Sequence, residues 1–154
     1  MKEIYLTALT NERYLPGALA LVRSLKEVKT QYDIAIMIPE SQKENLTLKL
    51  QEWGIIQDGV FTLVQPDVPM PETLDLKDYY WLDTFFKIQA ASCTEYDKIL
   101  LLDCDQMAVK NFDHLFEKSN IHLQHAEGVF IRIGYLCHRE CLSLNHPKNC
   151  MRNC

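Results

Sequence analysis

The sequence lacks the features of a membrane-spanning or nucleic-acid-binding protein. No apolar run approaches the about 20 residues that a transmembrane helix needs. Basic residues are not in excess either: 16 lysines and arginines stand against 21 aspartates and glutamates, for a net charge of −5. Because duplex DNA and anionic membranes are bound by basic surfaces, neither is an expected partner. A signal peptide is also missing, since Glu3 and the polar residues 11–13 interrupt the first apolar segment, so the expected compartment is the cytoplasm.

Composition divides the 154 residues into two regions. Residues 1–119 carry 12 basic and 19 acidic side chains in a regular apolar pattern, whereas residues 120–154 carry four basic and two acidic ones. The second region also holds four of the six cysteines and four of the five histidines. We therefore predict an α/β body over residues 1–119 and a divergent Cys/His-rich tail over residues 120–154.

The cysteines of the tail admit two interpretations. Together with two histidines they offer enough ligands for tetrahedral zinc, although their spacing departs from the usual two-residue gaps. Unpaired, reduced cysteines are the favoured alternative. The residues concerned are Cys137, His138, Cys141, His146, Cys150 and Cys154.

Apolar strands alternate with amphipathic helices through the body. The spacing predicts strands at residues 3–9, 32–38, 60–64 and 98–102, and helices at residues 15–28, 41–53 and 82–93. Such alternation is typical of right-handed βαβ units in a mostly parallel, Rossmann-like sheet. Ligands of these sheets bind beyond the carboxyl ends of the strands, near the reversal of strand order. The residues at such positions are Thr10-Asn11 and Asp103-Cys104-Asp105.

Asp103 and Asp105 follow the apolar strand 98–102 directly. On extended backbone, side chains at i and i+2 point to the same side, which would bring two negative charges together. A hard divalent cation, Mg²⁺ or Mn²⁺, relieves this repulsion by taking carboxylate oxygens. The alternative is an exposed turn in which both carboxylates are solvated or one of them caps a helix.

Three segments carry a family resemblance. Residues 94–116 contain, in order, a tyrosine, a basic residue, an apolar strand, D-x-D and an N-hydrophobic-D-x-L-F sequence. This order resembles the family 8 glycosyltransferases, the glycogenin and galactinol synthase group. LTNERYLPGALALVRSL (residues 9–25) is similar to their nucleotide-binding first loop and helix, and Lys87 matches a lysine before the D-x-D strand. The resemblance covers about residues 3–119 and implies a GT-A-type nucleotide-diphospho-sugar transferase fold.

The resemblance also implies roles for individual residues. Tyr14 would stack on the uracil of a UDP-sugar, Lys87 would reach its sugar or phosphates, and the backbone of Cys104 would lie near the ribose. The residues that would hold uracil and ribose are Ala8, Thr10, Asn11 and Tyr14. The residues that would bind Mn²⁺ (or Mg²⁺) are Asp103 and Asp105.

Each role has a structural alternative. Asn11 is also suited to cap the helix that follows, and Tyr14 to pack on Leu9. Lys87 could extend its ammonium from an apolar helix face into solvent.

The implied reaction is retaining transfer of a hexose from a UDP-sugar to an acceptor hydroxyl. Mn²⁺ on the diphosphate would act as a Lewis acid, Lys87 would add a second cation, and no protein nucleophile is required. The expected partners are thus a UDP-sugar donor and an unidentified acceptor, and a homodimer is left open.

The resemblance ends after Ser119. The family's F-N-S-G-type segment, its acidic residue and glutamine, and its late histidine ligand have no recognisable counterpart in residues 120–154. We therefore interpret the chain as truncated after the D-x-D region, with an incomplete C-terminal half.

Two other hypotheses fit parts of the sequence. The first is an inactive nucleotide-sugar-binding fragment. The second is a phosphohydrolase of the haloacid dehalogenase type, which also places D-x-D after an apolar strand. That class is disfavoured because Met107 stands where it has Thr or Val, and no later acidic pair follows.

Overall fold

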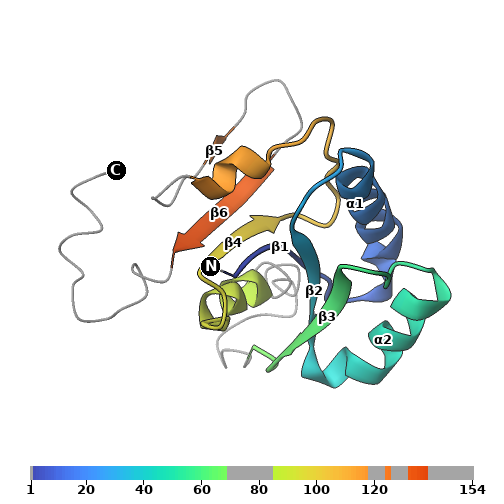
Figure 1. The fold of residues 1–154 in the computed structure, drawn as a ribbon. Coiled ribbons are helices and arrows are strands. Elements are labelled where there is room, and N and C mark those ends of the chain that lie inside the picture. The colour runs from blue at the N-terminus through green and yellow to red at the C-terminus, as the bar shows by residue number, and fades with distance from the viewer. Residues whose placement is uncertain (1, 69–84, 118–123, 126–131, 139–154) are drawn as a thin grey trace, which may run out of the picture.

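The computed structural model describes residues 2–68, 85–117, 124–125 and 132–138, and the structural statements below concern these residues (Figure 1). The described residues include six strands, two full α-helices and several short 3₁₀ helices. The strands are β1 (Glu3–Ala8), β2 (Asp33–Pro39), β3 (Val60–Gln65), β4 (Lys98–Leu102), β5 (Gln124–His125) and β6 (Arg132–His138). The helices are α1 (Leu15–Glu27) and α2 (Lys43–Glu52), with 3₁₀ helices η1 (Glu12–Tyr14), η2 (Glu40–Gln42), η4 (Lys87–Ser92) and η5 (Asp113–Glu117).

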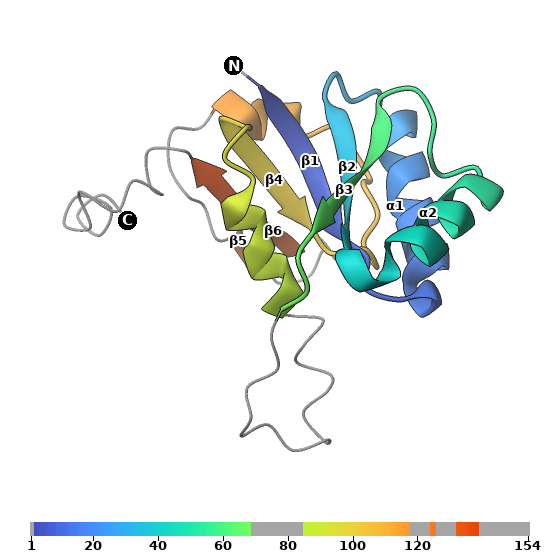
Figure 2. The same ribbon diagram turned by 90° about the horizontal axis from the view of Figure 1, so that it is seen from below.

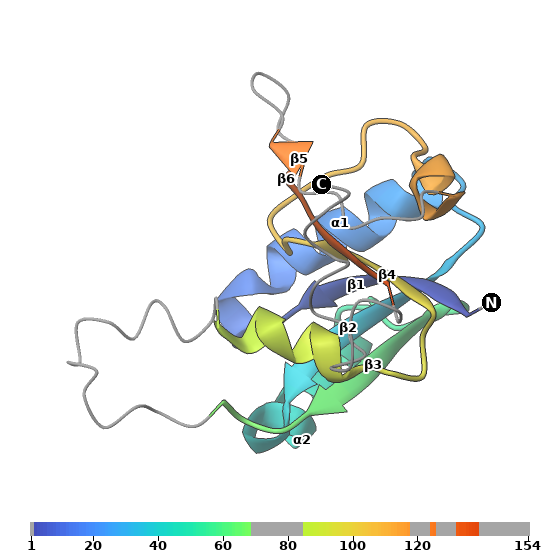
Figure 3. The same cartoon turned by 90° about the vertical axis from the view of Figure 1, so that its left-hand side faces the viewer.

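The strands form one sheet in the order β3-β2-β1-β4-β6-β5, which can be followed in Figure 3. β1 to β4 are parallel to one another, β6 is antiparallel to β4, and β5 is antiparallel to β6. The predicted α/β fold with a mostly parallel sheet is therefore confirmed.

Apolar side chains are buried on both faces of the sheet. α1, α2 and η5 pack on the face that carries Tyr5 and Leu100, whereas η4 packs on the opposite face with Ile4 and Leu101 (Figure 2). Every residue of β4 is buried, as expected for a central strand that is covered on both faces.

The first helix begins and ends as the sequence indicates. Asn11 caps η1, since its side chain accepts a hydrogen bond from the Arg13 backbone N–H at 3.1 Å. Pro16 stands in the first turn of α1, where its missing N–H costs nothing. Leu15, Leu21 and Leu25 then bury one face of the helix. The predicted capping by Asn11 is confirmed, although the capped turn is the short η1 rather than α1 itself.

The helix predicted at residues 82–93 differs in its geometry. Residues 82–84 lie outside the described part, residues 85–86 are α-helical as predicted, and residues 87–92 form the 3₁₀ helix η4 instead of an α-helix. The Ser92 hydroxyl donates to the Gln89 carbonyl at 2.7 Å, and the Cys93 N–H donates to Ala90. Both hydrogen bonds join residues i and i−3, the spacing of a 3₁₀ helix, and therefore favour a 3₁₀ helix over an α-helix.

Beyond residue 119 the structure describes two strands. β5 and β6 belong to the same sheet as the body, with Cys137 of β6 opposite Ile99 of β4. Cys141, His146, Cys150 and Cys154 lie outside the described residues, so the zinc and free-thiol interpretations both remain predictions, as does the domain boundary near 119. None of the described helices has both the length and the apolar character needed to cross a membrane.

Candidate functional site

The candidate site lies where the strand order of the parallel sheet reverses. From β1 the chain proceeds outward through β2 to β3, and β4 is then added on the other side of β1. Thr7 of β1 is in register with Leu102 of β4, so the two strands end side by side. The segments that follow them, Thr10-Asn11 and Asp103-Cys104-Asp105, are the two that the sequence singled out. Crevices at such reversals are where open α/β sheets bind ligands.

The residues after β4 form a tight turn, here called the acidic turn (Asp103–Gln106). The Gln106 N–H donates to the Asp103 carbonyl at 3.2 Å, and the Gln106 side-chain oxygen accepts from the Asp103 N–H at 3.2 Å. The extended backbone assumed for the D-x-D pair is therefore absent. Asp103 is half-buried, and Asp105 is exposed.

Cys104 lies between the two aspartates and is buried. Burial, reinforced by the negative charge of Asp105, raises the pKa of its thiol to about 11, although the Lys87 ammonium acts in the opposite direction. The thiol is therefore protonated at neutral pH, which makes it a poor nucleophile and a poor metal ligand.

Lys87 is the first residue of η4, and it reaches the acidic turn from the face of the sheet opposite to α1. Its ammonium forms an ion pair with Oδ1 of Asp103, and the two side chains are 30% and 26% exposed. Lys87 thus has a carboxylate partner, unlike the freely solvated lysine of the alternative interpretation. One of the two aspartates already has a compensating cation within the chain.

The predicted nucleotide-binding residues lie at the end of β1 and the start of α1. Ala8 is buried at the last position of β1, and Thr10 and Asn11 are half-buried beyond it. The Asn11 amide donates to the Thr10 hydroxyl at 3.4 Å in addition to its capping bond. Tyr14 is half-buried and packs against the core beside α1. The structural roles suggested for Asn11 and Tyr14 are therefore observed, and their contacts with uracil and ribose remain predictions.

α1 packs directly against the acidic turn, a contact that the sequence analysis missed. A Cβ on Gly17 would lie 2.5 Å from the Cys104 carbonyl oxygen and 3.3 Å from the Asp105 Cα. Further along the helix, the buried Ser24 hydroxyl accepts a hydrogen bond from the Ala108 N–H at 2.9 Å. A glycine among the leucines and alanines of residues 15–25 was the available signal for such a close approach.

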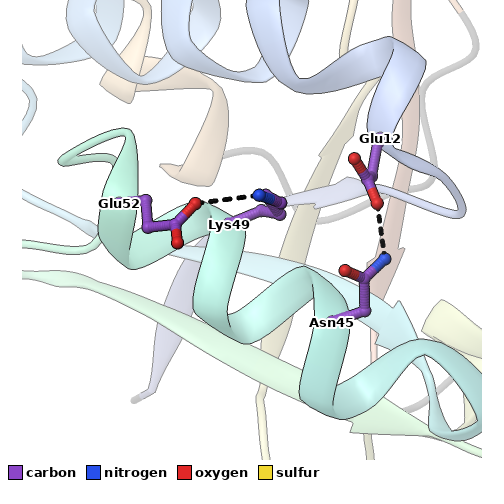
Figure 4. A network of polar contacts seen from close by, with 4 residues as sticks. All are labelled: Glu12, Asn45, Lys49 and Glu52. Atoms are coloured by element: carbon purple, nitrogen blue, oxygen red, sulfur yellow. Dashed lines mark hydrogen bonds and ion pairs between the residues drawn. The ribbon is translucent and has the colours of Figure 1, made fainter.

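A second set of contacts connects η1 with α2 (Figure 4). The Asn45 side-chain amide donates to a carboxylate oxygen of Glu12 at 2.7 Å. One turn further along α2, Lys49 pairs with Glu52 at 3.0 Å. The Glu12–Asn45 bond thus connects the loop that precedes α1 with α2, whereas the Lys49–Glu52 pair lies within α2.

The family model for Glycosyl transferase family 8 matches residues 5–126. The chain belongs to glycosyl transferase family 8. The matched residues of this family 8 protein include most of β1, all of β2, β3 and β4, Lys87 and the acidic turn. The family resemblance found in the sequence is thus confirmed.

The family 8 protein is also similar to several curated proteins. It is 36% identical over 110 residues to the Acanthamoeba polyphaga mimivirus protein described as "Uncharacterized protein R707". The aligned residues cover 71% of this chain and 37% of the viral protein. It is 26% identical over 137 residues to galactinol synthase 6 of Arabidopsis thaliana, covering 88% and 39% of the two chains. With glycogenin of Neurospora crassa it shares 32% identity over 136 residues, covering 87% and 19%. The family 8 chain therefore spans less than half the length of these relatives.

Asn111 and Asp113, which belong to the N-hydrophobic-D-x-L-F sequence, lie away from the site in this family 8 protein. Asp113 accepts hydrogen bonds from the Tyr5 hydroxyl at 2.7 Å, the Thr30 hydroxyl at 2.8 Å and the Gln31 N–H at 2.9 Å. Asn111 adds a bond to Asp113 and two more to the carbonyls that follow α1. These contacts connect the amino end of β1 with the α1–β2 loop, so this half of the motif is structural.

The acidic turn fits a divalent cation that is shared with a ligand. Within the described ranges, no cluster of three or more His, Cys, Asp or Glu side chains is arranged to hold a metal ion. Asp103 and Asp105 nevertheless place two carboxylates in one turn, and carboxylates are the ligands with which proteins hold Mg²⁺-like ions when substrate phosphates complete the coordination. These two residues would supply only part of a cation's ligands, and the described residues do not form a closed protein cage.

Proposed function

We propose that this family 8 protein transfers a hexose from a UDP-sugar to an acceptor hydroxyl with retention at the anomeric carbon. Residues 1–119 would form its donor-binding half. The observation that supports this most strongly is the meeting of three elements at the β1/β4 reversal: the acidic turn, the Lys87 ammonium and the start of α1. Carboxylates for a metal, a cation for phosphates and a loop for a nucleotide are together the requirements of a nucleotide-sugar site.

Asp103 and Asp105 would hold Mn²⁺ or Mg²⁺ at this site. The cation, when bound, supplies Lewis-acid stabilisation of the negative charge on the departing diphosphate. Lys87 lies close enough to Asp103 to pair with it, so its ammonium would remain beside the phosphates and add a second positive charge.

The loop before α1 would orient the nucleotide. In this proposal Thr10 and Asn11 bind the ribose and uracil with the backbone at Ala8, and Tyr14 stacks on the base. The Cys104 backbone would lie near the ribose. The Cys104 thiol is buried, so we assign it no role as a nucleophile, and the proposed step is direct attack by the acceptor hydroxyl.

Calorimetric titration with UDP tests the proposed donor site. We expect UDP to bind the wild-type protein more tightly with Mn²⁺ than with EDTA, and Asp105→Ala to lose this difference while remaining folded. Asp58→Ala is the matched control, because Asp58 is exposed in the loop before β3, at the opposite end of the strands. Equal affinity of the wild type in Mn²⁺ and EDTA would contradict the proposal.

Release of UDP from UDP-glucose or UDP-galactose tests turnover. A nucleotide-sugar-binding protein without activity would bind UDP with Mn²⁺ and release none from either sugar nucleotide. Phosphate release from a phosphomonoester would instead support the phosphohydrolase hypothesis.

A further inference from the structure

Gly17 is the residue of α1 that comes closest to the acidic turn. A Cβ at this position would lie 2.5 Å from the Cys104 carbonyl oxygen, well inside the 3.4 Å at which ordinary contact begins. It would also lie 3.3 Å from the Cys104 carbonyl carbon and from the Asp105 Cα. All three atoms belong to the backbone, so no side-chain rotation could make room for a methyl group.

Helix formation does not explain the glycine. Gly17 lies within α1 and has no positive φ, so the local backbone accepts any residue with a Cβ. Glycine is a poorer helix former than alanine, which occupies positions 18 and 20 of the same helix. The contact with the acidic turn is therefore the feature that requires a glycine here.

Residues 104–108 contact α1 at two points. The Cys104 carbonyl packs against Gly17, and just beyond the turn the Ala108 N–H donates to the Ser24 hydroxyl. Asp105 lies between these two points, and Tyr14 stands three residues before Gly17. The backbone at Asp105 therefore lies against the first turn of α1, which directly follows the predicted nucleotide loop.

We propose that Gly17 is a positioning residue that sets the spacing between the nucleotide loop and the metal-binding carboxylates. This inference rests on the proposed function. A Cβ at position 17 would push the turn away from α1 and carry Asp105 with it. A UDP group whose nucleoside is held by the loop and whose diphosphate is held by the cation would then no longer match both, because such sites tolerate displacements of only about 0.5 Å.

The test compares Gly17→Ala with Ala20→Gly in the full chain. UDP affinity is measured by calorimetry with Mn²⁺ and with EDTA, and folding by circular dichroism and urea titration. We expect Gly17→Ala to reduce the Mn²⁺-dependent gain in UDP affinity by about tenfold, one decade corresponding to a modest loss of binding energy. Ala20→Gly should weaken α1 and lower the urea midpoint while it retains the full Mn²⁺-dependent gain.

Each outcome has one meaning. If Gly17→Ala is folded and keeps the wild-type gain, the inference is wrong while the proposed function stands. If the wild type itself shows no Mn²⁺-dependent gain, the proposed function is wrong, and a positioning role fails with it.

A second variant covers a failure of Gly17→Ala to fold. Ser24→Ala removes the hydrogen bond to Ala108 at the far end of the contact, and we expect it to reduce the same gain. An unchanged gain in folded Ser24→Ala would then overturn the inference.

Discussion

Lys87 and Asp103 form an ion pair that a divalent cation would have to compete with. A half-exposed pair of this kind contributes little energy, about 0–1 kcal/mol, so the competition is expected to be modest. The same ammonium would favour a diphosphate once it arrives. Lys87 should therefore oppose the metal alone and support the metal together with nucleotide.

Substitution of Lys87 by methionine separates these two effects. We expect Lys87→Met to bind Mn²⁺ up to about fivefold more tightly without nucleotide, because Asp103 is freed. UDP binding in the presence of Mn²⁺ should become weaker, because a positive charge near the phosphates is lost. Mn²⁺ electron paramagnetic resonance and calorimetry measure the two affinities, with the exposed Lys110→Met as control. Identical Mn²⁺ affinity of Lys87→Met and wild type would refute the competition.

Individual contacts at the site were only partly predictable from the sequence. The apolar run before Asp103 indicated that the two carboxylates lie at the end of a strand. A strand buried along its whole length can be followed by polar residues only where it ends. The pairing of Lys87 with Asp103 could not be predicted, since it depends on how η4 is placed against the sheet. A turn at Asp103 and Asp105 was the alternative interpretation, but its closure by the backbone and side chain of Gln106 was not predicted, because no turn-forming glycine or proline marks it.

At the scale of elements, Asp113 connects β1, the α1–β2 loop and η5. Burial alone would raise the pKa of its carboxyl, but hydrogen bonds from Tyr5, Gln31, Thr30 and Asn111 outweigh burial and hold the pKa below its ordinary value. The folded carboxylate therefore binds protons less readily than the unfolded one. Its contribution to stability is complete above the ordinary aspartate pKa of about 3.9 and is lost as the pH falls through the lower, folded value.

Substitution of Asp113 tests this connection. We expect Asp113→Asn to lower the free energy of unfolding at pH 7 by about 1–2 kcal/mol, because a charged acceptor of several hydrogen bonds is lost. Its urea midpoint should also fall less between pH 5 and pH 3 than the wild-type midpoint does. Asp58→Asn, at an exposed position, should match the wild type in both measurements. A wild-type acid dependence in Asp113→Asn would show that this carboxylate does not link stability to pH.

The regular elements were predictable because their causes are local. The apolar runs of β1, β2 and β4, the cap at Asn11 and the helix-ending Gly54, whose φ is +64°, each act within a few residues. η4 was less predictable, since its apolar spacing suits an α-helix, and the Ser92–Gln89 and Cys93–Ala90 hydrogen bonds that favour a 3₁₀ helix are not visible in that spacing.

At the scale of the whole molecule, the donor site would couple ligand binding to stability. Its residues come from β1, α1, η4 and the turn after β4, so a ligand bound there would contact segments far apart in the sequence. A ligand that binds only the folded state at 100 times its Kd adds about 2.7 kcal/mol to the free energy of unfolding.

Thermal unfolding measures this coupling. We expect UDP with Mn²⁺ to raise the Tm of the wild type, and EDTA to reverse the rise. Asp105→Ala should show no rise, whereas Asp58→Ala should behave as the wild type. A Tm that responds equally in Asp105→Ala would place the bound nucleotide away from the acidic turn.

The antiparallel partner of β4 has a consequence for shortened forms of the chain. β6 pairs with β4 through Leu102 and Lys98 at its two ends, and β6 comes entirely from residues after 119. Removal of residues 120–154 would leave the outer N–H and C=O groups of the most apolar strand without partners. An exposed edge strand of this kind can pair with a strand of another molecule. A protein cut at residue 119 should therefore self-associate even if its nucleotide loop is intact.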